Sequence, residues 1–190
     1  MTHLVNHYGL IFLFAIVTAE SAGVWVPGET ALVTAGVLAS QGHLTIEWVI
    51  VVAAAGAIIG DNIGYWIGRT GGRRLAEKLP WLARFLPPAE RFFKRHGGKA
   101  VFFARFLAGL RVTGAWMAGI SRMHWATFLA WNAAGGIVWA TAVGLVAYFF
   151  GKVAADAISQ YGLYGGGAAA AVLVAALVGV HLWRKRAESS

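Results

Sequence analysis

Three long apolar segments constrain this chain more than any other feature. At about 1.5 Å per residue, residues 46–68, 124–150 and 161–183 can each cross roughly 30 Å of hydrocarbon as a helix. A soluble core does not need such runs. With 58% of the residues hydrophobic and only 13% charged, the composition also argues against a soluble enzyme. The sequence therefore predicts an all-α integral membrane protein, organised as a single membrane domain over residues 1–190.

Two further apolar segments are interrupted and predict a different element. Residues 8–40 contain Glu20 and a Val-Pro-Gly-Glu turn, and residues 100–121 contain two arginines. Broken backbone at membrane depth is tolerated only where protein or a wet cavity surrounds it. We therefore expect two oppositely oriented re-entrant helical hairpins, each followed by a transmembrane helix. This inverted repeat is typical of secondary transporters, although the two halves share no clear sequence identity.

The basic residues predict how the chain is oriented. The first 68 residues contain no Lys or Arg, whereas residues 69–99 contain nine and a further cluster lies at residues 184–186. The positive-inside rule places both basic regions in the cytoplasm. We therefore expect a multi-pass protein of the cytoplasmic (inner) membrane, with a cytoplasmic amphipathic segment at 69–99 and a cytoplasmic C-terminus. Beside apolar spans the net charge of +8 indicates anionic lipids as partners, and no nucleic acid.

The usual enzyme and targeting signatures are missing from the sequence. The chain has no cysteine, and it contains neither an HExxH metal motif, a GxSxG elbow nor a phosphate-binding Walker loop. The apolar stretch at residues 8–17 lacks the preceding basic residues and the clean cleavage site of a signal peptide. We expect neither an enzyme nor a bound cofactor or metal.

Ionisable side chains at membrane depth are the candidate functional residues. Left unpaired in lipid, five such groups would cost on the order of 15 kcal/mol, so they must pair, lose their charge or face water. One interpretation is that they neutralise one another and only hold the hairpins in place. The other is a substrate site, in which two arginines six residues apart bind one phosphate and the carboxyl groups carry protons. The five residues are Glu20, Glu29, Asp61, Arg105 and Arg111.

For Asp61 the two interpretations weigh equally. It lies beside a helical face of glycines at positions 56, 60, 64 and 68, where another helix can approach closely. That face can pack within one protomer or between two, which leaves a homo-oligomer possible.

Several motifs in order resemble the DedA family of membrane proteins, which shares the VTT or SNARE-associated domain. The motifs are Glu20-x8-Glu29 with the turn at Pro27-Gly28, GDNIGYWIGR at 60–69, FFKRHGGK at 92–99, FARFLAGLR at 103–111 and AGISRM at 118–123. Residues 124–190 are similar only in hydropathy. Ala108 stands where the family commonly has proline, so the break of the second hairpin is expected to rely on Gly109.

The resemblance implies transport of a polyprenyl phosphate carrier lipid, undecaprenyl phosphate in bacteria, with protons as the coupling ion. Arg105 and Arg111 would hold the lipid phosphate, and Glu20, Glu29 and Asp61 would serve proton coupling or gating. Two alternatives stay open: a proton-coupled antiporter or exporter of a small solute, and an envelope scaffold in which the charges are structural.

Overall fold

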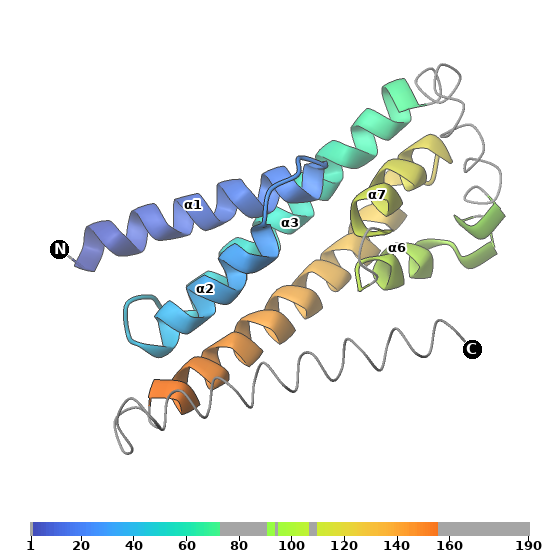
Figure 1. Cartoon of the computed structure of the whole chain (residues 1–190). Coiled ribbons are helices and arrows are strands. Elements are labelled where there is room, and N and C mark those ends of the chain that lie inside the picture. The colour runs from blue at the N-terminus through green and yellow to red at the C-terminus, as the bar shows by residue number, and fades with distance from the viewer. Residues whose placement is uncertain (1, 73–90, 94, 107–109, 156–190) are drawn as a thin grey trace.

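The computed structural model describes residues 2–72, 91–93, 95–106 and 110–155, and every regular element among them is helical (Figure 1). The all-α prediction is thus confirmed for this part of the chain. The elements are α1 (Thr2–Ala22), α2 (Gly28–Ser40), α3 (Ile46–Ile67), the π-helical turn η1 (Gly68–Gly72), α6 (Gly98–Ala104), α7 (Leu110–Ile120) and a final long helix, Trp125–Ala155.

Two of these helices are long and apolar enough to cross a membrane. Ile46–Gly72 has 27 residues and Trp125–Ala155 has 31, which correspond to roughly 40 and 46 Å of helix. They coincide with the predicted spans at 46–68 and 124–150. The predicted span at 161–183 and most of the amphipathic segment at 69–99 lie outside the described residues.

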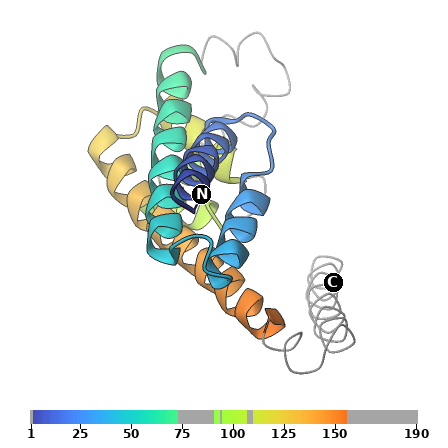
Figure 2. The same ribbon diagram turned by 90° about the vertical axis from the view of Figure 1, so that its left-hand side faces the viewer.

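The first interrupted segment forms a pair of helices, α1 and α2. Gly23 takes a left-handed φ of 113° at the end of α1, where the Val24 amide donates to the Ala19 carbonyl and closes the helix. Pro27 then precedes the first turn of α2. Figure 2 looks almost along α1 and shows α3 on one side of it and α2 on the other.

The second interrupted segment forms a shorter pair, α6 and α7, which pack against each other. Helix α7 lies along α3 and η1, and its last residue, Ile120, is in contact with Gly72. Both interruptions therefore produce helix pairs at the predicted positions. That the pairs turn back inside the membrane, and that they form an inverted repeat, stay predictions.

The glycines of α3, together with Gly68 at the start of η1, let one helix of each pair approach closely: α1 from the first pair and α7 from the second. A Cβ at Gly60 would lie 2.4 Å from the Thr18 carbonyl oxygen of α1, and one at Gly68 would lie 2.2 Å from the Trp116 carbonyl oxygen of α7. Gly56 faces α1 and Gly64 faces α7 in the same way. Small residues are required here because the backbones are nearly in contact. The face packs within the protomer.

Two apolar cores result, one for each helix pair. In the first, α1 and α2 pack on residues 49–57 of α3 and on Trp139 and Ala140. In the second, α6 and α7 pack on Tyr65 of α3 and on Phe128. Between the two cores, α3 and the final helix contribute the buried polar residues Asp61 and Asn132. A polar layer therefore separates the two halves of the protein.

Candidate functional site

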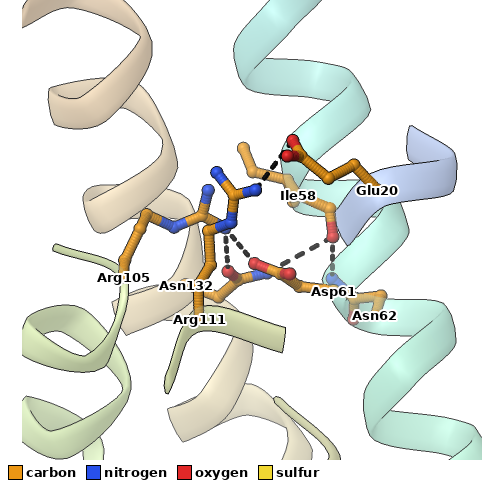
Figure 3. A network of polar contacts seen from close by, with 7 residues as sticks. All are labelled: Glu20, Ile58, Asp61, Asn62, Arg105, Arg111 and Asn132. Atoms are coloured by element: carbon orange, nitrogen blue, oxygen red, sulfur yellow. Dashed lines mark hydrogen bonds and ion pairs between the residues drawn. The ribbon is translucent and has the colours of Figure 1, made fainter. Parts of the chain in front are cut away.

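The polar layer is organised around Arg105, which follows the last residue of α6. Its side chain is 2% exposed, and its Nη2 contacts the Asp61 carboxylate of α3 in a buried ion pair. The same nitrogen donates to the amide oxygen of Asn132 at 2.8 Å (Figure 3). The buried guanidinium is therefore held by one charged and one neutral acceptor.

A second ion pair lies next to the first and joins the two helix pairs. Nη2 of Arg111, in the first turn of α7, lies 2.7 Å from Oε2 of Glu20, near the end of α1 (Figure 3). The contact does not meet the angles of a hydrogen bond at Oε2 of Glu20, so it is an ion pair and not a directed hydrogen bond. The side chains are 13% and 18% exposed, more than those of the first pair. The Arg111 guanidinium also lies 5.3 Å from the ring centroid of Trp139, a cation–π distance.

The turn between α1 and α2 sets the position of Glu20. A Cβ at Gly28 would lie 2.5 Å from Oε2 of Glu20, so only glycine leaves room for the carboxylate there. The preceding Pro27 fixes the direction in which α2 departs. The Pro-Gly-Glu motif thus contributes to the cluster because Gly28 leaves room for the Glu20 carboxylate, and not only because it contains Glu29.

The two guanidinium groups lie close together at the centre of the cluster (Figure 3). Nη1 of Arg105 is buried and has no hydrogen-bond partner in the described part of the chain. Oδ1 of Asp61 is likewise buried without a partner there. Buried donors are normally satisfied, and two adjacent cations repel each other. An anion with several oxygen atoms, placed between the two guanidinium groups, would accept from Nη1 of Arg105, whereas Oδ1 of Asp61 is itself an acceptor and would need a donor.

The structure brings four of the five predicted site residues together and leaves one apart. Glu20, Asp61, Arg105 and Arg111 form the cluster. Glu29 lies exposed in the first turn of α2, and no ion pair joins it to another described residue. A carboxylate in the first turn of a helix interacts favourably with the helix dipole. No group of three potential metal ligands occurs in the described ranges.

Sequence reasoning missed two members of the cluster, Asn132 and Trp139. Asn132 is 1% exposed in the middle of an apolar span, and its amide nitrogen donates to the Ile58 carbonyl at 3.3 Å. An amide inside such a span needs a hydrogen-bonding partner, so its position was the signal available in the sequence. Trp139 carried no such signal, because its contact with Arg111 depends on how three helices pack.

Two further tryptophans, Trp116 and Trp125, have different surroundings. Nε1 of Trp116 bonds the Ala22 carbonyl at 3.3 Å, and its ring packs on Gly64 between the two helix pairs. Trp125 instead lines a groove of about 650 Å³ between α3 and the final helix, where its Nε1 donates to Asn62 at 3.0 Å. The groove is otherwise lined mainly by isoleucine, leucine and tryptophan side chains.

Comparison with known proteins identifies the family. The VTT domain matches residues 26–149, a range that contains the cluster except for Glu20. The chain is a DedA family membrane protein. It is 31% identical over 164 residues to protein DedA of Escherichia coli, covering 80% of this chain and 75% of the relative. An uncharacterized membrane protein of Synechocystis is 40% identical over 157 residues, covering 80% and 72%.

An uncharacterized membrane protein of Mycobacterium bovis is 39% identical over 155 residues, covering 77% of this chain and 71% of the relative. No solved structure matches the chain. The relatives named as membrane proteins, together with the two long apolar helices, identify this DedA protein as a membrane protein.

Proposed function

We propose that this protein moves a polyprenyl phosphate lipid across the cytoplasmic membrane, with the phosphate bound between Arg105 and Arg111. The observation that carries the proposal is the buried Nη1 of Arg105, which has no partner among the described residues and lies beside a second guanidinium. Guanidinium groups bind phosphate through parallel N–H donors. DedA family membership suggests a membrane transporter or flippase, and the anion site gives that role a chemistry.

The surroundings of the cluster favour an anion attached to a lipid over a soluble anion. Apolar cores lie on both sides of the polar layer. Large apolar side chains are exposed on the outer faces of the helices, such as Phe12 at 65% and Phe149 at 59%. Those faces suit contact with hydrocarbon chains. A phosphate entering from the side of the bundle would bring its lipid chain into surroundings of matching polarity.

The less buried ion pair supports coupling to protons. A phosphate that binds Arg111 competes with Glu20 for the same guanidinium, because the two anions need the same donors. A Glu20 released from Arg111 is left without its counter-charge, and we assign the coupled proton to this carboxylate. By linkage, a proton taken up by Glu20 must in turn favour phosphate binding. Asp61 is held by the buried Arg105 and serves as the fixed partner of the cluster.

The test uses purified full-length protein in liposomes, with transbilayer movement of undecaprenyl phosphate as the measurement, with and without a pH gradient. Because lysine has a point charge and no planar fork, Arg111→Lys and Arg105→Lys should each slow transport by about tenfold or more. The dephosphorylated alcohol, undecaprenol, should not compete for the site.

Two results would contradict the proposal. Full transport by both lysine variants would exclude a bidentate phosphate site. A paired exchange, Glu20→Arg with Arg111→Glu, keeps opposite charges facing each other while it moves the cation to α1. Unchanged transport in that paired variant would indicate that the charges only hold the helices together, as a scaffold role requires.

A further inference from the structure

The amide of Asn132 is held at both ends inside the polar layer. Its oxygen accepts from Nη2 of Arg105 at 2.8 Å, and its nitrogen donates to the Ile58 carbonyl at 3.3 Å (Figure 3). The side chain is only 1% exposed, so water does not compete for either bond. Because a backbone carbonyl can only accept, the amide nitrogen must face Ile58 and the oxygen must face Arg105.

The groups around Asn132 explain why an amide suits this position. Arg105 and Asp61 lie next to it, and Arg111 of α7 and Glu20 of α1 complete the cluster. Two cations therefore face two anions. A carboxylate at position 132 would leave the cluster with an excess of negative charge and would repel phosphate. An amide supplies the acceptor that Arg105 requires and adds no charge.

We infer that Asn132 is a positioning residue for anion binding: it directs the Arg105 guanidinium without neutralising it. With Nη2 shared between Asp61 and Asn132, Nη1 remains the donor without a partner in the described chain. The inference rests on the proposed function, because it assigns the purpose of that free donor. Asn132 itself does not touch the phosphate.

The test compares two substitutions at Asn132, one that removes the hydrogen-bond acceptor and one that adds a charge. Asn132→Leu keeps the approximate volume and removes the acceptor. Asn132→Asp keeps an oxygen toward Arg105 and adds a negative charge. Protonation removes that charge, and the protonated carboxyl can accept a hydrogen bond from Arg105 while it donates one to the Ile58 carbonyl. The measurement is binding of farnesyl phosphate to the full chain in detergent, with farnesol as the phosphate-free control. Affinity is compared with the wild type at pH 5.5 and pH 8, and thermal unfolding is recorded in parallel.

Asn62→Leu is the matched control. The Asn62 amide also donates to the Ile58 carbonyl, at 2.8 Å, but its oxygen accepts from Trp125 and not from Arg105. The substitution therefore removes the same kind of bond to the same carbonyl without changing the environment of the guanidinium. We expect farnesyl phosphate affinity to stay within about twofold of the wild type, because Asn62 bonds Ile58 and Trp125 and reaches Arg105 only through the Ile58 carbonyl that it shares with Asn132.

Asn132→Leu should weaken farnesyl phosphate binding by about tenfold or more, by a similar factor at both pH values, because it removes a hydrogen bond to a charged group. Asn132→Asp should bind as weakly or more weakly at pH 8 and should approach the wild type at pH 5.5. A purely structural amide would lower the unfolding temperature without this acid recovery.

Each contrary outcome bears on a separate conclusion. Wild-type affinity in both Asn132 variants, or lost stability with unchanged affinity, would overturn the positioning role and leave the proposed function standing. An aspartate variant whose defect does not change with pH would overturn the argument from charge. A wild-type protein that binds farnesyl phosphate no better than farnesol would overturn the proposed function and this inference with it. Should Asn132→Leu fail to fold, the more conservative Asn132→Asp decides the matter.

Discussion

The two helix pairs dock on the same helix in the same manner but carry opposite charges. Helix α1 of the first pair packs on Gly56 and Gly60, and helix α7 of the second pair packs on Gly64 and Gly68. The first pair contributes carboxylates and no Lys or Arg, whereas the second contributes the two arginines. Neither pair balances its charges alone. The polar layer is therefore neutral only after both pairs have assembled on α3.

The two ion pairs within that layer also differ, and the difference separates a fixed contact from an exchangeable one. Arg105 and Asp61 are 2% and 4% exposed and are surrounded by protein. Arg111 and Glu20 are 13% and 18% exposed, and they join the two helix pairs directly. A buried partner cannot leave without stranding a charge, whereas a partly exposed one can exchange its partner.

We expect the two pairs to approach α3 from opposite sides of the membrane. The chain contains no cysteine, so single cysteines report position without background. We expect Gln41→Cys, beside the start of α3, to react with an impermeant maleimide from outside the cell. Gly71→Cys, in η1 beyond the end of α3, should react only after permeabilisation. Labelling of both sites from the same side would refute the predicted topology.

Removing either arginine should lower the free energy of unfolding, by different amounts for the two ion pairs. Arg105→Leu leaves the Asp61 carboxylate buried and unpaired, so we expect a loss of about 3–5 kcal/mol in the free energy of unfolding. Arg111→Leu breaks the more exposed pair and should cost only about 1 kcal/mol. Denaturant unfolding in detergent measures both.

The double variant Asp61→Leu with Arg105→Leu serves as the control for the stranded charge. It should recover much of the stability lost in Arg105→Leu, because no unpaired charge remains in the layer. Equal losses in the two single arginine variants would mean that burial does not distinguish the two pairs.

Glycine substitutions test whether close packing holds the second pair on α3. A Cβ at Gly68 would meet the backbone of Trp116, which cannot move aside without displacing α7. We expect Gly68→Ala to cost about 1–3 kcal/mol in the free energy of unfolding. Gly71 has open space around its Cβ position, and Gly71→Ala should be close to neutral. Similar unfolding midpoints for the two variants would argue against the close contact.

The smallest expected effects concern the two glutamates of the first pair. Glu29 is exposed, so Glu29→Gln should change stability by less than about 0.5 kcal/mol and leave the response of transport to a pH gradient intact. Glu20→Gln should cost about 1 kcal/mol. It should also abolish that response, because the amide cannot exchange a proton. A Glu20→Gln protein with wild-type pH dependence would assign the protons to another group, with Asp61 the next candidate.

Much of the fold could be predicted from patterns of polarity. Apolar runs of sufficient length indicated the two long helices, and the Pro-Gly-Glu turn and the paired arginines indicated where the other apolar segments break. The glycines on one face of residues 56–68 indicated close packing. Their partners could not be predicted, because the spacing of glycines is the same whether the neighbour is another helix of this chain or a second copy.

That charges at membrane depth must find partners follows from the sequence, because hydrocarbon offers no solvation for Arg105 or Asp61. Which residues become those partners depends on the folded arrangement. Arg105 contacts Asp61 across 44 residues, Arg111 contacts Glu20, and the neutral Asn132 completes the layer. The physical reason is that solvation cost depends on each residue alone, whereas pairing depends on which backbones can approach closely enough to bring two side chains together.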